Sequence, residues 1–254
     1  MNKKKKRQAA LLKIIGEQGM VPVKIMASML QVSQMTIHRD LVELKDKPAE
    51  LEENKEHRED SDGGTSYNLF QAIQNANEQK EKIGKFAAGM LNEGDVVILD
   101  TGSTTNRMLP HIPTDKNISV VCFNANVLLE LRHKPGIRIF FAGGIYHPNT
   151  EMCESPEGIG FLRRLRANKV FLSAAGVHET LGVTCANEYE IATKNTIIQS
   201  ASEHILLVDS GKFGRVHSSH FCDMDVIHSV VTDQNISKEW RSILKAAGIA
   251  VYTV

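Results

Sequence analysis

Residues 96–105 read VVILDTGSTT, a short apolar run followed by a polar turn that contains one glycine. Six further apolar runs follow, and helical stretches stand between most of them. Short continuous apolar runs separated by helices are typical of a mainly parallel sheet that is covered on both faces. We therefore expect an α/β domain over residues 71–254. Its strands are predicted at 96–99, 118–123, 137–143, 169–176, 204–209, 228–233 and 249–254, and its helices at 77–92, 125–133, 188–202 and 237–247.

The turn at 100–105 is the first candidate for a ligand site, because ligands of parallel sheets bind at the carboxyl ends of the strands. Gly102 allows the backbone to turn sharply, so that successive N–H groups can point at one anion. The hydroxyls of Ser103, Thr104 and Thr105 add further donors. These features predict a phosphate-binding loop, although a capped turn would use the same residue types. The loop matches neither a Walker motif nor a dinucleotide fingerprint, and no cofactor is expected.

Other predicted strands also end in polar or glycine-rich loops, which a parallel sheet would bring to the same edge. Lys212 supplies a cation for a phosphate or carboxylate, and Asp100 and Asp209 can accept hydrogen bonds from sugar hydroxyls. A single lysine after a strand is usually a surface residue, so its weight comes from the convergence of several loops. The predicted ligand-binding residues are Asp100, Gly102, Ser103, Thr104, Thr105, Asn124, Gly143, Gly144, Asp209 and Lys212.

The first fifty residues predict three short helices. The first covers about 5–18, and the second covers about 23–30 with apolar residues at i, i+3, i+4 and i+7. A tight turn follows, and Ser33 is well placed to cap the third helix. Two helices that share a core across a turn of three to four residues form a helix-turn-helix. The alternative is a plain three-helix bundle with a polar face.

The outward face of the third helix carries side chains that are able to read DNA. Residues near the start of a recognition helix reach base edges in the major groove. Gln, Thr and Arg are suitable readers there, and Ser and Thr can also hold phosphates. The predicted DNA-binding residues are Ser33, Gln34, Thr36, His38 and Arg39.

The net charge of the chain is zero, but the charge is unevenly distributed. Residues 1–47 contain ten Lys and Arg against four Asp and Glu, whereas residues 48–62 contain two against seven. A basic head is favourable for contact with phosphates, while carboxylates near phosphates repel. We therefore interpret 49–62 as a wing tip or linker that does not contact DNA, and an acidic interaction patch is the alternative. The first domain is expected to cover residues 1–70.

Composition excludes several other classes of protein. No apolar run approaches the length of about 20 residues that spans a bilayer, and the N-terminus lacks the pattern of a signal peptide. The four cysteines are widely spaced without a CxxC pair, so neither a zinc site nor a disulfide framework is predicted. Reduced thiols favour a cytoplasmic protein with no membrane partner.

The stretch VSQMTIHRDL at 32–41 resembles the helix-turn-helix signature of the DeoR family of bacterial repressors, LxVSxxTIRRDL, and departs from it at His38. DTGSTT at 100–105, the glycine pair at 143–144 and VDSGKFG at 208–214 resemble further elements of that family, and Gly211 stands where the family usually has Ser. The resemblance implies a second domain similar in fold to ribose-5-phosphate isomerase and used as a sensor of phosphorylated sugars.

These features predict a repressor of a carbohydrate or nucleoside catabolic operon that binds double-stranded operator DNA and responds to a phosphorylated sugar such as a pentose or deoxypentose phosphate. A homo-oligomer is expected, because one recognition helix contacts too few bases for specificity. The alternative is a sugar-phosphate isomerase with an added DNA-binding head. Glu188 and Glu190 are the candidates for its catalytic base, but no flanking motif supports them. A generic interaction module would leave both motifs unexplained.

Overall fold

The structure is a computed structural model, and it divides the chain into two compact units, Met1–Gly64 and Thr65–Val254. It describes residues 78–254 together with Lys4, Arg7, Gln8, Ala10, Leu11, Met26, Ala27, 29–33, 35–37, Arg39, Asp40, Asn68 and Leu69. The predicted acidic wing or linker at 49–62 lies outside the described residues.

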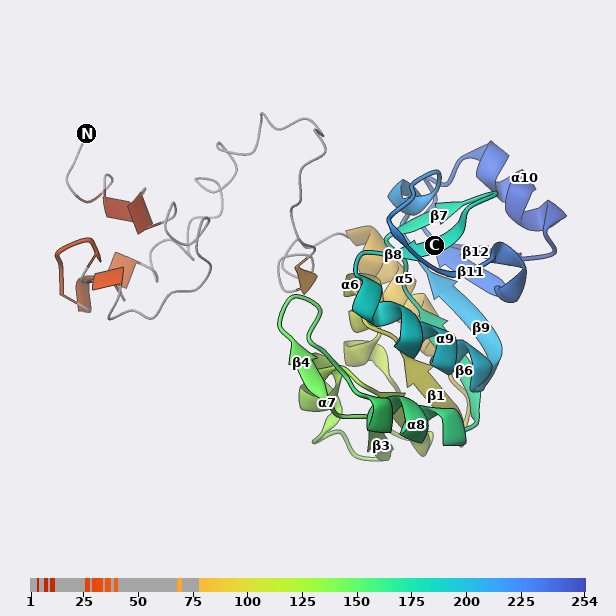
Figure 1. The fold of residues 1–254 in the computed structure, drawn as a ribbon, viewed down its shortest axis with the longest axis horizontal. Coiled ribbons are helices and arrows are strands. Elements are labelled where there is room, and N and C mark those ends of the chain that lie inside the picture. The colour runs from red at the N-terminus through yellow and green to blue at the C-terminus, as the bar shows by residue number, and fades with distance from the viewer. Residues whose placement is uncertain are drawn as a thin grey trace. The chain divides into compact units, whose positions relative to one another are not determined.

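The second unit is built on a seven-stranded sheet in which all neighbouring strands run parallel (Figure 1). Each of the seven predicted apolar runs forms one of these strands, so the expected parallel sheet is confirmed. Strand β1 stands near the middle of the sheet. In spatial order the strands are β12 (Ala250–Thr253), β11 (Ser229–Thr232), β9 (Ala201–Leu207), β6 (Ala167–Leu172), β1 (Val96–Leu99), β2 (Ile118–Cys122) and β3 (Ile137–Phe141).

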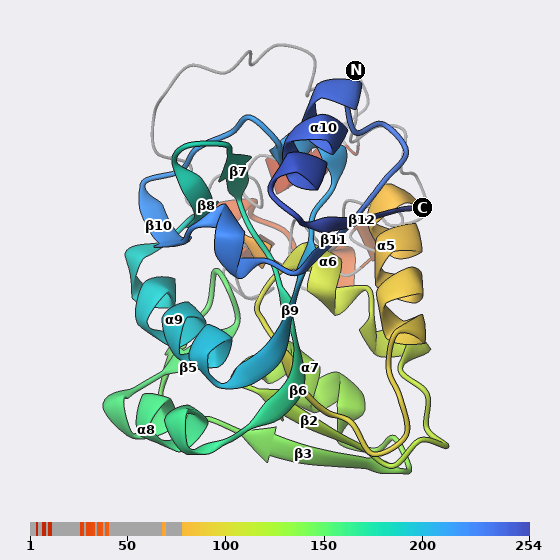
Figure 2. The ribbon, with the colours of Figure 1, turned by 90° about the vertical axis from the view of Figure 1, so that its right-hand side faces the viewer.

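Helices cover both faces of the sheet (Figure 2). On one face α5 (Glu78–Gly89) and α7 (Ala125–Leu131) share a buried core with Val97 and Leu99 of β1, and the short α6 (Ser103–Asn106) lies against α5. On the other face α8 (Pro156–Arg164), α9 (Ile191–Gln199) and α10 (Lys238–Ala246) share a core with Ile98. Because side chains of a strand point alternately to the two faces, covering both faces requires a continuous apolar run.

Two small antiparallel elements complete the unit and were not expected. A three-stranded sheet is formed by β7 (Gly176–His178), β8 (Gly182–Cys185) and β10 (Ser219–Cys222), and a hairpin by β4 (Ile145–His147) and β5 (Met152–Glu154). These strands have only three or four residues, which is too short for an alternating pattern to emerge. Four single-turn 3-10 helices are also described: η2 (Leu109–His111), η3 (Glu188–Glu190), η4 (Ser210–Lys212) and η5 (Met224–Val226).

The helix predicted at 188–202 is wrong at both ends. Its first three residues form η3, α9 ends at Gln199, and β9 begins at Ala201, three residues before the predicted strand. Ser200 caps the end of α9, where its N–H donates to the carbonyls of Ile197 and Ile198, and its buried hydroxyl donates to the carbonyl of Leu162 in α8 at 3.0 Å. The polar start of β9 has the composition of a helix surface, and its pairing with β6 decides its conformation.

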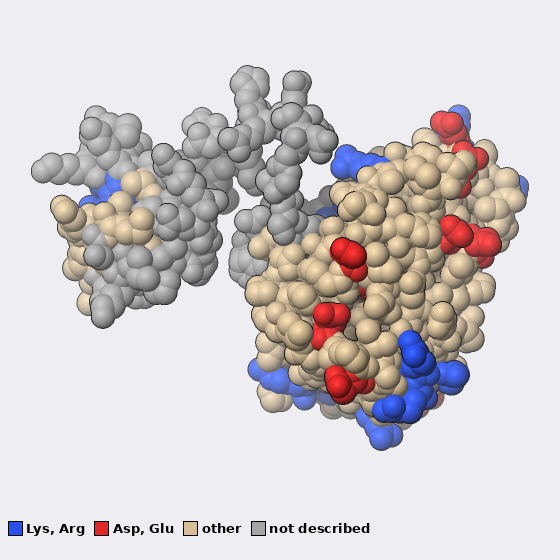
Figure 3. Space-filling model, in the orientation of Figure 1, with Lys and Arg blue, Asp and Glu red and all other residues tan. Residues whose placement is uncertain are grey.

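Basic side chains gather at the end of the second unit that holds α8 (Figure 3). Arg163, Arg164 and Arg166 are exposed at the carboxyl end of this helix. The guanidinium of Arg166 donates to the carbonyls of Arg163 (3.0 Å) and Leu165 (2.7 Å). Cations near the last turn of a helix stabilise its unpaired carbonyls, so this patch has a structural explanation.

Within the described ranges, no helix is long and apolar enough to cross a membrane. The same residues contain no cluster of three His, Cys, Asp or Glu side chains arranged to hold a metal ion.

Candidate functional site

The order in which the chain adds strands to the sheet reverses between β1 and β6. From β1 the chain adds β2 and β3 on one side, whereas β6, β9, β11 and β12 are added on the other. The loops that follow β1 and β6 therefore diverge at their common edge, which is where ligands bind in open parallel sheets. The two loops are in contact, because a Cβ on Gly102 would lie 2.5 Å from the Cβ of Ser173. Glycine at 102 is required by this close approach.

Asp100, the first residue after β1, is buried, and both of its carboxylate oxygens accept from donors of the protein. One carboxylate oxygen accepts from the N–H of Thr101 at 2.8 Å. The other accepts from the N–H of Ser173 at 2.9 Å, from its hydroxyl at 3.3 Å and from the ammonium of Lys194. Asp100 therefore fixes the two loops to each other. It is not presented as an acceptor for a sugar hydroxyl, the role expected from the sequence.

Lys194 of α9 is the counter-ion of Asp100 and is only 1% exposed. A second carboxylate, that of Glu190, lies 3.7 Å from the ammonium nitrogen. Burial alone lowers the pKa of Lys194, but the two carboxylates outweigh burial and raise that pKa above its usual value. Lys194 is therefore a permanent cation under the ligand edge. Lys194 was not predicted from the sequence, although its i, i+4 spacing from Glu190 is a weak signal.

The hydroxyls of the loop divide into two groups. Thr101 donates to the carbonyl of Thr150 at 2.8 Å, and Thr105 to the carbonyls of Asp100 and Gly102 at 3.0 and 2.9 Å. These two threonines hold the loop in shape. The hydroxyls of Ser103 and Thr104 form no hydrogen bond within the described part of the chain, so they remain able to bind a ligand.

Asn124 and the predicted glycine pair shape the neighbouring loops. With its amide oriented to satisfy both groups, buried Asn124 donates to the carbonyl of Leu99 (3.3 Å) and accepts from the N–H of Thr101 (3.2 Å). Gly144 has φ +152° and follows Gly143 into the hairpin, where a Cβ would lie 2.2 Å from the carbonyl oxygen of Glu154. All three residues lie where strands β2 and β3 end.

Charged side chains of α5, of the turn after β9 and of the residue after α6 influence one another. Asp209 and Lys212 belong to the turn after β9, where the Asp209 carboxylate accepts from the N–H of Gly211 at 3.1 Å. Burial lowers the pKa of Lys80 in α5; Asp209 opposes this, while the positive charges of Lys212 and Arg107 lower it further. Lys212 and Arg107 are therefore both close enough to Lys80 to repel it, and the guanidinium of Arg107 also lies 3.7 Å from the carboxylate of Glu81. Lys80 and Arg107 were not predicted, because nothing in the sequence separates them from the other charged residues of their segments.

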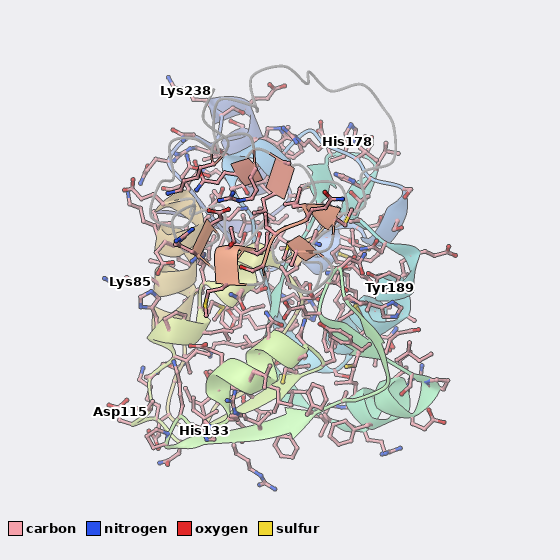
Figure 4. The ribbon with its side chains drawn as sticks, turned by 90° about the vertical axis from the view of Figure 1, so that its left-hand side faces the viewer. Lys85, Asp115, His133, His178, Tyr189 and Lys238 are labelled. Atoms are coloured by element: carbon pink, nitrogen blue, oxygen red, sulfur yellow. The ribbon has the colours of Figure 1, made fainter. Side chains whose placement is uncertain are left out.

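The loop between β4 and β5 connects the ligand edge to the start of the unit. Its Thr150 accepts the hydrogen bond from Thr101, and the carbonyl of Asn149 accepts from the N–H of Leu69 at 2.6 Å. Tyr189, labelled in Figure 4, joins the two loop residues, because its hydroxyl lies 3.1 Å from that of Thr150 and 2.8 Å from the side-chain oxygen of Asn149. Buried Leu69 thus anchors the chain leading into this unit beside the candidate site.

The carboxylates considered for an isomerase are poorly placed for that role. Glu190 is buried, and its pKa is raised by burial against the opposing effects of Lys194 and Asn187. One of its oxygens accepts from the side chain of Asn187 at 2.8 Å and from its N–H at 3.2 Å. Glu188 is exposed. Glu190 therefore forms part of the helix start and of the Lys194 ion pair.

The described part of the first unit forms a helix-turn-helix. Leu11, Met26, Ala27 and Ile37 share one buried core, and Gln31 adopts φ +51° in the turn between the second and third helices. The hydroxyl of Ser33 accepts from the N–H of Thr36 at 3.2 Å, which is the predicted cap.

The predicted DNA-binding residues lie at or after this cap. The two hydroxyls of Ser33 and Thr36 are 2.8 Å apart, and Arg39 is exposed on the third helix. Gln34 and His38 lie outside the described residues. Asp40 is buried and paired with Arg7 of the first helix at 2.5 Å, so Arg7 fastens two helices together instead of extending toward DNA.

A helix-turn-helix followed by a parallel α/β unit with a candidate anion site at its carboxyl edge defines a DNA-binding regulator with a sensor domain. Residues 7–51 match the model of the DeoR-like helix-turn-helix domain, and residues 75–234 match that of the DeoR C terminal sensor domain. The chain therefore belongs to the DeoR family, as its motifs indicated.

Several curated relatives align over almost the whole chain. The Deoxyribose operon repressor of Escherichia coli K12 is 29% identical over 237 residues, which cover 91% of each chain. The HTH-type transcriptional repressor GlcR of Bacillus subtilis is 26% identical and covers 96% of this chain and 93% of its own. The Lactose phosphotransferase system repressor of Staphylococcus epidermidis is 28% identical and covers 89% and 90%.

Two of the solved structures that are similar to the chain overlap with it only in part. The β subunit of eIF2B from Chaetomium thermophilum has a TM-score of 0.43 at 18% identity and covers 61% of this chain and 48% of its own. Ribose 5-phosphate isomerase A from Methanocaldococcus jannaschii, an enzyme with the fold that the family resemblance implied for the second domain, has a TM-score of 0.38 at 18% identity and covers 53% of each chain. At these TM-scores neither structure serves as a guide to the site.

Proposed function

We propose that this protein represses a carbohydrate or nucleoside catabolic operon and that a phosphorylated sugar, such as a pentose or deoxypentose phosphate, controls its binding to operator DNA. The observation that carries the proposal is the pair of uncommitted hydroxyls, Ser103 and Thr104, at the switch point of the sheet. The relatives support the class of operon, because their names assign them to deoxyribose and to the lactose phosphotransferase system.

The phosphate is proposed to bind in the Gly102–Thr105 loop. A phosphate dianion removed from water needs several N–H and hydroxyl donors together with compensating cations. The loop offers backbone N–H groups and the hydroxyls of Ser103 and Thr104. Lys80 is repelled by Lys212 and by Arg107, and an anion beside Lys80 would relieve that repulsion.

The sugar itself is proposed to face Asp209, whose carboxylate keeps acceptor capacity beyond its bond to Gly211. Asp100 and Asn124 are retained in the proposed site as residues that position the loop, and Gly143 and Gly144 as residues that shape the adjacent turn. This arrangement assigns direct contacts to fewer residues than the sequence suggested.

Control of DNA binding would operate through a homo-oligomer in the cytoplasm, where operator DNA is found. Paired recognition helices read two half-sites, and an effector that binds one conformation more tightly shifts the population toward it. We propose a regulator without enzymatic activity, because Glu190 is already engaged by Lys194 and Asn187. A coupled assay is expected to detect no isomerisation of ribose 5-phosphate.

The test is a double variant, Ser103→Ala with Thr104→Ala, studied in the full chain. A thermal-shift screen of pentose, deoxypentose and hexose phosphates first identifies the effector, which at about 100 times its Kd should stabilise the fold by about 2.7 kcal/mol. The double variant is expected to bind operator normally and to lose the response to the effector.

The matched control is Ser237→Ala, which removes a cap of α10 far along the chain, where the Ser237 hydroxyl accepts from the N–H of Trp240 at 3.1 Å. This change should cost about 1 kcal/mol and leave the response intact. If the double variant behaves like Ser237→Ala, with a lower Tm and an unchanged response, the loop is a structural turn and the phosphate binds elsewhere.

A further inference from the structure

Met35 is the most exposed large apolar side chain among the described residues, at 79%. It stands two positions after Ser33, which caps the third helix of the helix-turn-helix, and so belongs to the first turn of that helix. Two positions further on, Ile37 is completely buried in the core of the unit. The packing of the unit therefore does not account for a methionine at position 35.

Most of the described side chains near Met35 in the sequence already contact other residues of the unit. The hydroxyls of Ser33 and Thr36 face each other at 2.8 Å, and the Asp40 carboxylate is held by Arg7. Arg39 is exposed and stands four residues after Met35. Residues four apart lie on the same face of a helix. Among the described residues of this helix, Met35 and Arg39 thus form an outward-facing pair, one apolar and one cationic.

We propose that Met35 is a specificity-determining residue that contacts the methyl group of a thymine in each operator half-site. This inference rests on the proposed binding of operator DNA by the third helix. In the major groove the C5-methyl of thymine is the apolar group that a base pair presents, and the other base edges are hydrogen-bond donors or acceptors. An uncharged thioether side chain gains nothing from a phosphate, whereas it buries apolar surface against a methyl group.

Arg39, four residues after Met35, indicates where this thymine lies relative to a guanine. Arginine pairs preferentially with the O6 and N7 atoms of guanine. Four residues of helix span about 6 Å along its axis, and successive base pairs are about 3.4 Å apart. If the helix lies along the groove, the thymine read by Met35 and the guanine read by Arg39 are about two base pairs apart.

The experiment begins with selection of bound duplexes from a random pool by the full chain, which defines the half-site. Each thymine of the selected duplex is then replaced, one at a time, by deoxyuridine, which lacks only the methyl group. One thymine per half-site is expected to weaken binding by the parent protein about four-fold, the loss for one methyl-sized apolar group. Met35→Ala and Met35→Gln should bind the thymine and deoxyuridine duplexes equally well.

Met29→Ala is the matched control, since Met29 is a 48% exposed methionine in the same small unit. It should keep the sensitivity to deoxyuridine. If Met35→Ala keeps that sensitivity as well, the inference is overturned while operator binding stands. Equal weakening of every duplex by Met35→Ala, with the sensitivity retained, also overturns it. A selection that returns no bound duplex refutes the proposed function itself, and the inference with it.

Discussion

Replacing Lys194 by methionine removes the cation that neutralises two buried carboxylates while keeping most of the side-chain volume. The ammonium contacts Asp100 directly and lies 3.7 Å from Glu190, and its surroundings exclude water. Removing one partner of a buried ion pair costs about 3–5 kcal/mol, because the remaining charge is left without compensation. For a unit of this size each kcal/mol lowers Tm by about 2–4 °C. We therefore expect the Tm of Lys194→Met to fall by about 6–20 °C.

The loss should depend on pH with a defined sign. Burial already raises the pKa of Glu190, and Lys194 opposes that rise. Without Lys194 the folded-state pKa of Glu190 rises further above its unfolded value. Stability gained by protonation is present below the unfolded pKa and is lost as pH rises through the folded pKa. The deficit of the variant relative to the parent protein should thus be smaller at pH 5 than at pH 8.

Lys169→Met provides a matched control, because Lys169 of β6 pairs with Asp95 immediately before β1, whereas Lys194 of α9 pairs with Asp100 immediately after it. Lys169 is buried and paired with Asp95 at 2.6 Å, so its loss should also lower Tm. The two variants should differ in function. Only Lys194→Met is expected to reduce the effector-induced change in operator affinity, measured by gel shift below the lower of the two melting temperatures. If the Tm of Lys194→Met lies within 2 °C of the parent, or if both variants respond equally to the effector, Lys194 is not the cation that holds the ligand edge together.

Three further predictions concern other parts of the chain. Deleting Lys3–Lys6 should weaken binding to all DNA sequences and flatten the salt dependence of binding, and an unchanged salt slope would contradict this prediction. Arg7→Ala should instead lower Tm, because buried Asp40 loses its partner. Arg39→Ala should cost about 1–3 kcal/mol of operator affinity without lowering Tm, and equal losses on random DNA would show a phosphate contact instead of base reading. Burial alone raises the pKa of Asp233, but hydrogen bonds from backbone N–H groups outweigh burial and lower that pKa. The stability this gives is present above about pH 3.9 and is lost as pH falls through the folded-state pKa, so acid titration of the parent and Asp233→Asn should show the two curves converging.

The parallel sheet could be predicted because its inner strands are buried on both faces. A strand such as β2 must then be apolar along its length, and the run ISVVCF is visible without any knowledge of its neighbours. The short antiparallel strands, such as β7 and β4, carry no such signal, since they have three residues each and are fixed by contacts distant in the chain. The start of β9 was misplaced for a related reason, because its pairing with β6 overrides its polar composition.

The candidate site could be predicted where it depends on strand ends and not where it depends on helices. The loops at Asp100, Asn124 and Asp209 follow apolar runs, and the topology alone brings them to one edge. Lys194 and Lys80 come from α9 and α5, and which face of a helix turns toward the edge depends on tertiary packing. The sequence also suggested an accessible carboxylate at Asp100, whereas its burial follows from a contact with Ser173 that is 73 residues away.

Strand β1 has four apolar residues, and a buried aspartate stands immediately before and immediately after them. Each aspartate is held by its own lysine, Asp95 by Lys169 and Asp100 by Lys194. A slip of the strand by one residue would reverse its two faces and draw one carboxylate into the apolar layer. The two ion pairs therefore oppose sliding of β1 along its neighbours. The four residues of β1 keep Asp95 at one end of the strand and Asp100 at the other at a constant separation. Any rearrangement that a ligand causes must then take place around β1, in the loops and helices that surround it, and not along it.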